Sequence, residues 1–480
     1  MQIAHWMKID YIWIDALCIL QDSTQDWEHQ SARMGDIYTH SYCNIAATGA
    51  EPTKGCFTYR HTPMVEPYSI SNPRSKGSED DPEETYVIGY DDFWSNSLLD
   101  TPLHNRGWVL QERLLSPRTI HFGQEQMFWE CRRDIACEAY PEGIPEQFRN
   151  WRTRAWRQSD EMLDPKKRKP TRLPISPLSL WQTISEYMLR IARPMNPKPP
   201  VVHLTWAYEI WSKTIERYME CKLSFSEDKL VAISGIAKGV ANATRERYLA
   251  GLWDNALLPQ SLLWYVLGRR QADSTPSTRS ASQGDQNYRA PSWSWASLEA
   301  KLIWNWPVQC GKVLIEISST FVEDFGGIKM GRVSAASMTI QGRLFEANLR
   351  LRNESPDKPH EEDGRYILQL SKIIRGENLV EMEPTIFLDV PMTTQSTSVK
   401  TYLLPVCEEW QGRSGSMVTD VAGLLLKRAS ASTEEAKYER IGIFGLDRSQ
   451  AKTLYDIAIG EFDSVETRPM VRNKNSITLV

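Results

Sequence analysis

The sequence predicts an α/β N-terminal domain, a helical middle region and a β-rich C-terminal domain. Near the start, an apolar run, a helix-start signal and a second apolar run follow one another. That is the order of a strand–helix–strand unit with a parallel sheet. Between residues 180 and 267 apolar side chains recur at helical spacing. After residue 312 short runs alternate with period two between turns, which favours a β-sandwich or a partly closed sheet.

The N-terminal unit begins with residues 11–14 (YIWI), which are rich in aromatic and β-branched side chains. Such a run suits a strand buried on both faces, so we expect an interior strand here. Ser23 and Asp26 have the spacing of a capped helix start, which predicts a helix over 26–39. Residues 43–48 are short and apolar enough for a second strand.

Polar side chains follow the first predicted strand, namely Asp15, Cys18, Gln21 and Asp22. Ligands bind at the carboxyl edge of open parallel sheets, and a carboxylate there can accept hydrogen bonds from ribose or sugar hydroxyls. The alternative, which residue chemistry favours, is that Asp15 satisfies backbone donors where the strand passes into the helix.

In the rest of the first domain, the sequence predicts three features. These are a polar surface loop over 51–85, a helix over 103–115 that Pro117 ends, and a hairpin around Gly123. The loop carries a run of acidic residues. Metal sites need converging ligands, and these are nearly consecutive, so we interpret the run as solvated. Its members are Glu79, Asp80, Asp81, Glu83 and Glu84.

The sequence predicts helices in the middle part of the chain and strands in the C-terminal part. Trp206, Trp211, Trp253 and Trp264 fit core packing better than a cofactor site. We expect a linker and helical region over 151–270, with helices at 180–192, 204–221, 229–240 and 257–267. A flexible linker is expected over 271–290, then a β-rich domain over 291–480, with strands at 313–322, 337–343, 366–370, 386–390, 401–406, 421–427 and 440–446.

Composition limits the classes of partner and the cellular compartment that we expect for this chain. The 480 residues carry a net charge of -5, which gives no electrostatic case for nucleic acid or a membrane surface. The eight cysteines lack paired spacing, which predicts free thiols in a reducing compartment. Neither a secretory signal nor a transmembrane run is present, so we expect a cytoplasmic protein. Nuclear import is an alternative through the basic run Lys166, Lys167, Arg168 and Lys169, although a solvated linker is the simpler interpretation.

Sequence motifs for common chemistry are absent: there is no phosphate-cradling glycine loop, dinucleotide fingerprint, zinc-protease helix or serine-hydrolase elbow. Cys131 and Cys137 have no second pair at zinc-ligand spacing. His104 and His121 fit core or surface positions. We therefore expect no metal and no resident cofactor.

Several blocks resemble the fungal heterokaryon-incompatibility (HET) domain. The first comprises WIDALCI at 13–19, Gln21-Asp22, Asp26-Trp27, Met34, Ile37-Tyr38, IAA at 45–47 and Gly55-Cys56-Phe57. The next is RGWVLQERLLSPRTIHFG at 106–123, which contains Arg106, Trp108, Gln111 and Glu112. FSEDKLVAISGIAK at 225–238 and PSWSWA at 291–296 resemble later elements of the family, the second of them a strand.

The resemblance implies a TIR-like or flavodoxin-like parallel sheet in a HET domain over 1–150. The family's earlier block, a Leu-Ser-Tyr-x-Trp-Gly-like strand end, is not seen before residue 11, so we expect an N-terminally incomplete domain with its first strand missing. The implied function is fungal self/non-self recognition and triggered cell death through protein assembly. Protein partners, self-association included, would follow. Trp13 and Trp27 are expected in the core.

An alternative implied by the likeness to TIR domains is cleavage of NAD, with NAD as substrate. The family often has a glutamate three residues after Trp27, where this chain has Gln30. Glu28 cannot replace it, because two helical residues lie ~200° apart around the axis. A neutral amide stabilises an oxocarbenium ion less than a carboxylate does. Asp15, Gln30 and Glu28 are therefore weak catalytic candidates. We favour a non-catalytic chain, and a degenerate, inactive member is a third interpretation.

Overall fold

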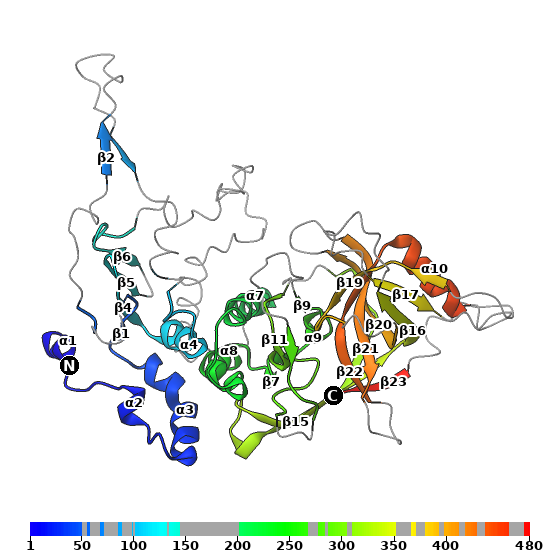
Figure 1. Cartoon of the computed structure of the whole chain (residues 1–480), viewed down its shortest axis with the longest axis horizontal. Helices are drawn as coiled ribbons and strands as arrows, with labels where there is room; N and C mark the ends of the chain where they lie inside the picture. The colour runs from blue at the N-terminus through cyan, green and yellow to red at the C-terminus, as the bar shows by residue number, and fades with distance from the viewer. Residues whose placement is uncertain are drawn as a thin grey trace. The chain divides into compact units, whose positions relative to one another are not determined.

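Two compact units make up the chain: Met1–Asn196 with Val231–Gly239, and Pro197–Leu230 with Val240–Val480. Figure 1 shows the computed structural model from which they are described. It describes residues 1–49, 55–57, 68–71, 85–88, 98, 101–131, 134–144, 201–266, 277–283, 287–304, 310–351, 366–370, 380–392, 398–411, 418–429, 437–459 and 475–480. The predicted acidic run, the basic run, the helix at 180–192 and the side chain of Trp206 lie outside the described residues.

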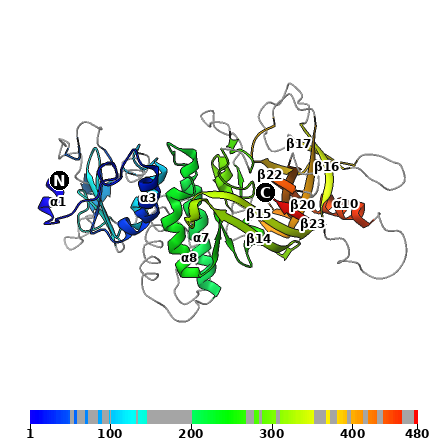
Figure 2. The ribbon, with the colours of Figure 1, turned by 90° about the horizontal axis from the view of Figure 1, so that it is seen from below.

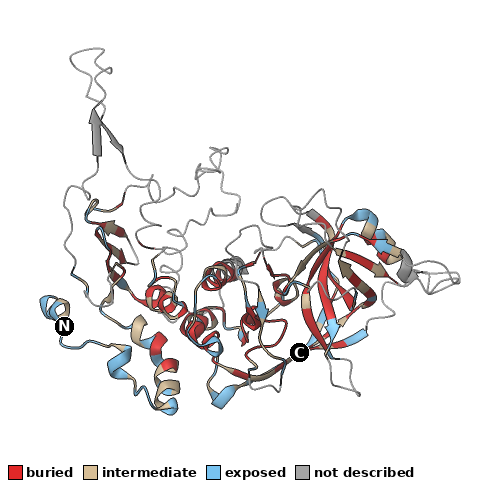
Figure 3. Cartoon of the chain, in the orientation of Figure 1, coloured by how far each residue is buried: buried red, intermediate tan, exposed pale blue. Residues whose placement is uncertain are grey.

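Two short helices, α1 (Gln2–Trp6) and α2 (Asp15–Cys18), open the first unit, and residues 11–14 between them form no strand. The predicted interior strand is therefore wrong. Tyr11 is 90% exposed, and no described strand pairs with this run. An apolar run becomes a strand only where neighbouring backbone accepts and donates its hydrogen bonds. Figure 3 shows both helices mostly exposed.

Helix α3 (Thr24–Thr39) comes next and confirms the predicted helix. The Ser23 side chain accepts a hydrogen bond from the Asp26 backbone N–H at 3.2 Å, as the cap spacing predicts. The buried residues of this helix are Ser31, Met34 and Gly35.

The sheet of the first unit has four strands in the order β1-β4-β5-β6. Strand β1 (Asn44–Ala46) is the predicted second strand and runs parallel to β4 (Arg118–Phe122). Strands β5 (Met127–Cys131) and β6 (Ile135–Cys137) continue the sheet antiparallel, because short turns can join only antiparallel neighbours. The N-terminal part is thus α/β with a small mixed sheet, and the expected parallel sheet of TIR-like or flavodoxin-like type is not what these strands form.

Helix α4 (Gly107–Leu115) confirms the helix predicted before Pro117, and the backbone is already extended at Ser116. The predicted surface loop is interrupted by a two-stranded antiparallel ribbon, β2 (Tyr68–Ser71) with β3 (Thr85–Ile88). Their aromatic and β-branched residues are the strand signal, which the surrounding Pro, Gly and Ser residues obscured.

In the helical part of the chain, α7 (Val201–Tyr218) and α8 (Ser234–Thr244) confirm two predicted helices. The helix predicted over 257–267 is only one turn, α9 (Leu258–Ser261), because the residues after it form strand β9 (Tyr265–Val266). The backbone of Tyr265–Val266 therefore pairs with another strand and does not continue the helix. The partner strand is β12 (Leu302–Ile303); further short strands are β7 (Arg247–Leu249), β8 (Leu252–Asp254), β10 (Thr278–Arg279) and β11 (Leu298–Glu299).

The strand expected at PSWSWA is instead a turn followed by a 3₁₀ helix, η8 (Trp295–Ser297). Ser294 Oγ accepts the Ala296 N–H at 3.1 Å and donates to the Ala250 carbonyl at 2.5 Å. Such side-chain bonds to nearby backbone compete with strand pairing. Trp293 and Trp295 are both fully buried, so this stretch is core.

A single eleven-stranded sheet dominates the C-terminal part, with every pair antiparallel except β22 with β23. Figure 2 shows the long β14–β15 hairpin at one end of it. The seven predicted strands are all confirmed, as β14 (Glu316–Asp324), β15 (Val333–Gly342), β17 (Tyr366–Leu370), β19 (Thr385–Leu388), β20 (Val399–Gln411), β21 (Val418–Arg428) and β22 (Lys437–Leu446). Not predicted were β13 (Lys312–Val313), β16 (Phe345–Leu351), β18 (Val380–Met382), β23 (Asn475–Leu479) and helix α10 (Arg448–Ile459).

One face of this sheet shares a hydrophobic core with α10. Leu349 on β16, Leu403 on β20, Leu425 on β21 and Leu454 on α10 are all fully buried in the same cluster. Alternation along each strand places these residues on one side, which is why the period-two signal predicted the strands so well.

We expect Val421→Ala on β21 to lower the free energy of unfolding of this unit by about 2 kcal/mol, because Val421 is 1% exposed in the core cluster. Val390→Ala, the same change at a position 38% exposed, should cost much less. Chemical denaturation followed by tryptophan fluorescence compares the two. Equal losses would contradict the packing described.

Candidate functional site

The predicted polar residues after the N-terminal run lie on and just beyond α2, and all are exposed. Asp15 accepts a hydrogen bond from the Ala16 backbone N–H at 2.8 Å. Gln21 Nε2 donates to the carbonyls of Asp15 at 3.2 Å and Ile19 at 2.9 Å, which closes the turn after the helix. Local backbone bonding thus accounts for Asp15 and Gln21.

Gln30, the weak catalytic candidate on α3, is tied to its own helix. Its Nε2 lies 3.4 Å from Asp26 Oδ1, and the other oxygen of Asp26 accepts the Leu20 N–H at 2.8 Å. Asp26 thereby joins the first turn of α3 to the chain that enters it. Glu28 is partly buried two positions away, on another side of the helix.

Four motif residues from separate blocks do come together, on α2, α3 and α4. The Glu112 carboxylate hydrogen bonds to the Tyr38 hydroxyl, and both interact electrostatically with Asp15 and Arg106. The Trp13 ring packs edge-on against Tyr38, with ring centroids 5.7 Å apart. The structure thus brings Arg106 and Glu112 of the block at 106–123 near Asp15 and Tyr38 of the block that begins at residue 13.

Burial sets the protonation of this cluster. It raises the pKa of Glu112 to about 7, although the Tyr38 hydroxyl and Arg106 both favour the ionised form. Burial also raises the pKa of Tyr38 well above its ordinary value, and Glu112 adds to that effect. Near neutral pH Glu112 therefore titrates, while Tyr38 keeps its proton and can donate to it.

Trp27 packs edge-on against Trp108, with ring centroids 6.3 Å apart, so the pair joins α3 to α4. Both Trp13 and Trp27 are only partly buried, which corrects the expectation that they are core residues. The buried residues of α3 are instead Ser31, Met34 and Gly35.

Gln111 is fully buried, and its Oε1 accepts a hydrogen bond from the Gly235 backbone N–H at 2.7 Å. Gly235 lies in the first turn of α8, where backbone N–H groups have no partner within the helix. The family-motif glutamine is therefore a helix cap supplied from far away in the sequence. Sequence reasoning missed this role, and a glycine after Ser234 at a helix start was the available signal.

A buried polar network, also missed from the sequence, connects α4 to the sheet. Arg113 pairs with Glu130 through two bonds, one of 2.8 Å from Nε, and His121 Nε2 lies 2.9 Å from the same carboxylate. Thr48 Oγ1 lies 3.4 Å from His121 Nδ1. Burial alone would raise the pKa of Glu130, but Arg113 and His121 outweigh it and hold that pKa well below its usual range. Burial lowers the pKa of His121.

In the described part of the chain, no three His, Cys, Asp or Glu side chains converge to form a set of metal ligands. Cys131 and Cys137 are free, as are the other six cysteines. Among the described helices, none combines the length and apolar character needed to cross a bilayer.

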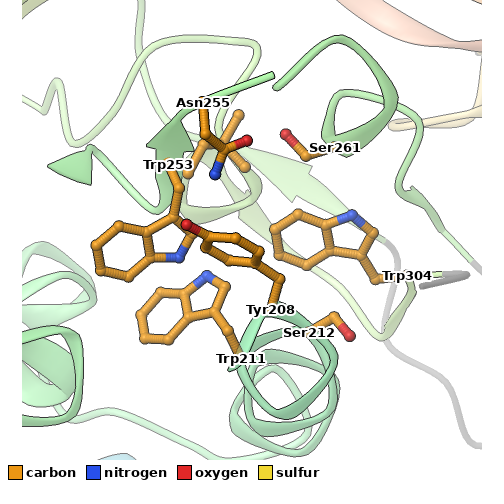
Figure 4. Close-up of a pocket in the computed structure, with 8 residues that line it drawn as sticks. Tyr208, Trp211, Ser212, Trp253, Asn255, Ser261 and Trp304 are labelled. Atoms are coloured by element: carbon orange, nitrogen blue, oxygen red, sulfur yellow. The ribbon is translucent and has the colours of Figure 1, made fainter. Parts of the chain in front are cut away.

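The second unit contains a small aromatic pocket (Figure 4), with about 260 Å³ of empty space including its open side. Trp211 and Trp253 meet edge-on there, with ring centroids 5.4 Å apart. The exposures of Trp211, Trp253 and Trp264 are 1%, 4% and 0%, which confirms them as core residues. The pocket is lined by Tyr208, Trp211, Ser212, Leu252, Trp253, Asn255, Ser261 and Trp304.

The raised pKa of Glu112 predicts a pH dependence. A carboxyl group whose pKa is higher in the folded state stabilises the fold at low pH, and that contribution is lost as pH rises from about 4.5 towards 7. We expect Glu112→Gln, which stays neutral, to raise the free energy of unfolding relative to the parent at pH 8 but not at pH 4.5.

Denaturant unfolding of the first unit at both pH values measures this difference. Glu125→Gln, at an exposed turn position, is the matched control and should show no such pH-dependent gain. A parent and a Glu112→Gln variant with parallel pH profiles would contradict a titrating Glu112.

Comparison with known proteins agrees with these blocks. The family model for heterokaryon incompatibility protein (HET) matches residues 1–112, which span α1 to α4 and include every motif residue of the cluster. No curated protein and no solved structure matched the chain. Residues 1–112 of this chain are a heterokaryon incompatibility (HET) domain.

Proposed function

We propose that this chain acts in fungal self/non-self recognition and triggers cell death after incompatible cells fuse, by assembling with protein partners. The HET domain at 1–112 is the observation that carries the proposal. Its motif residues Tyr38 and Glu112 join α3 to α4, and Gln111 joins α4 to α8, so the domain has the organisation on which a family function can rest.

Assembly with a protein partner is supported by the exposed apolar side chains of the first unit. Trp6, Tyr11, Leu17 and Leu20 are between 64% and 90% exposed. Large apolar groups on a surface favour contact with another protein. We place the activity in the cytoplasm, and the eight free thiols support a reducing compartment.

Expression of the full chain in a filamentous fungus tests this function. We expect induced expression to reduce colony survival, and Arg106→Ala to relieve that loss, because Arg106 is an exposed motif residue beside Glu112. Arg33→Ala, at an exposed position of α3, is the matched control and should stay toxic. Normal survival with the parent chain, at protein levels confirmed by immunoblot, would contradict the proposal.

Cleavage of NAD is the second candidate, and the titrating Glu112 beside Tyr38 is the observation that favours it. Departure of nicotinamide leaves positive charge on the ribose, which a carboxylate stabilises. Gln30 supplies only a dipole, and it is bonded to Asp26. We therefore favour a non-catalytic domain.

Purified protein of this sequence should release no nicotinamide from NAD above the buffer rate, for the electrostatic reason just given. Chromatographic assay of nicotinamide over hours is the measurement, with Gln30→Glu as the variant that restores a carboxylate. Steady release by the parent chain that disappears in Asp15→Ala would make the enzyme the leading function.

A further inference from the structure

The first unit contains a segment that the HET match does not include. Val231–Gly239 belongs to this unit, although the family match ends at residue 112. The segment consists of the 3₁₀ turn η7 (Val231–Ile233) and the first residues of α8. It packs against both α3 and α4. The HET domain therefore presents a face that a distant part of the same chain covers.

Where this segment meets the α3–α4 face, the backbones of Gly35 on α3 and Gly235 on α8 lie very close together. A Cβ atom added to either glycine would lie 2.7 Å from the Cα of the other, which real Cβ atoms do not tolerate. At Gly235 the added atom would also lie 2.7 Å from Gln111 Oε1 and 2.8 Å from Leu115 Cδ1. Both positions therefore need glycine for this contact, because only glycine lets the two backbones come so near.

Two hydrogen bonds fix the segment on this face. Gln111 Oε1 accepts from the Gly235 N–H at 2.7 Å, and Lys238 Nζ donates to the Ala32 carbonyl at 2.5 Å. The first satisfies a backbone donor in the opening turn of α8. The second crosses from α8 to the backbone of α3. The contact is thus directional as well as apolar.

The receiving surface is built by the N-terminal residues themselves. Ser31, Met34, Gly35, Gln111 and Leu115 are all buried. The Nε2 of Gln111 has no hydrogen-bond partner among the described residues. The bond from Gly235 to Oε1 is therefore what orients this side-chain amide. The face is therefore a receptor for a helix start that carries glycine and a lysine three residues later.

From this geometry we propose that the α3–α4 face of the HET domain is a binding site for the Ser-Gly-Ile-Ala-Lys helix start, filled by the chain's own residues 234–238 and, when these are released, by the same segment of a second copy. An element that fits in one chain fits equally well in its copy, which makes exchange a low-cost route to a dimer. The covalent connection favours the intramolecular contact through its high effective concentration. This inference concerns assembly and does not depend on the incompatibility role.

A labelled peptide of residues 229–244 (KLVAISGIAKGVANAT) tests the site on the full chain by fluorescence anisotropy. Gly235→Ala in the chain should displace its own segment and leave the receiving face intact. That chain should bind the peptide about tenfold or more tightly than the parent chain, in which the face is occupied. A peptide carrying the same Gly235→Ala change should not bind.

The matched control is Asn242→Ala, an exposed position on the same helix. Both substitutions raise helix propensity, so a propensity effect would act alike in both chains, whereas docking separates them. Adding Gly35→Ala to the Gly235→Ala chain should abolish peptide binding, because it obstructs the face itself.

Hydrogen exchange checks that the sheet strands β4 and β5 stay protected in each variant. Should Gly235→Ala unfold the unit, Lys238→Met takes its place, since it removes only the bond to Ala32. Peptide binding that is equal in the parent, the Asn242→Ala chain and the opened chain would overturn the proposal, as would a folded, opened chain that binds no peptide.

Discussion

The buried ion pair between Arg113 and Glu130 fixes how helix α4 is rotated against the sheet. Consecutive helical residues point about 100° apart, so fixing one side chain sets the direction of its neighbours. With Arg113 held on β5, Glu112 meets Tyr38 of α3 and Gln111 meets Gly235. Three successive residues of one helix thus connect a sheet, a helix and a distant segment. Removing one partner of a buried pair is costly, because the remaining charge stays buried without compensation.

Two carboxylates near α4 differ in their roles: Glu130 on β5 faces Arg113, and Glu112 lies on α4 itself. Glu130 stays ionised because Arg113 and His121 face it, and it serves the fold. Burial raises the pKa of Glu112, one position from Arg113, to about 7, so its charge responds to pH changes that leave the ion pair unchanged. Arg113 and Glu112 are neighbours on α4 and project to different sides of it, so the ion pair with Glu130 and the titrating Glu112 occupy separate surroundings.

Local signals predicted this fold well, and nonlocal pairing limited the rest. Ser23 and Asp26 predicted the start of α3, and period-two alternation predicted seven strands of the large sheet. The run at 11–14 has the composition of a strand, but composition does not supply the neighbouring backbone that a strand needs. The same holds for the site: the motif blocks were visible, while the approach of Gly35 to Gly235 depends on two positions that no local pattern connects.

The discontinuity of the first unit also orders events during protein synthesis. The receiving residues leave the ribosome long before Gly235, since the last of them, Leu115, lies 120 positions earlier in the chain. At ~5–20 residues per second, that face remains uncovered for about 6–24 s in every nascent chain. Neighbouring nascent chains on one polysome would therefore expose, at the same time, the face around Gly35 and Gln111 that is buried in the folded protein.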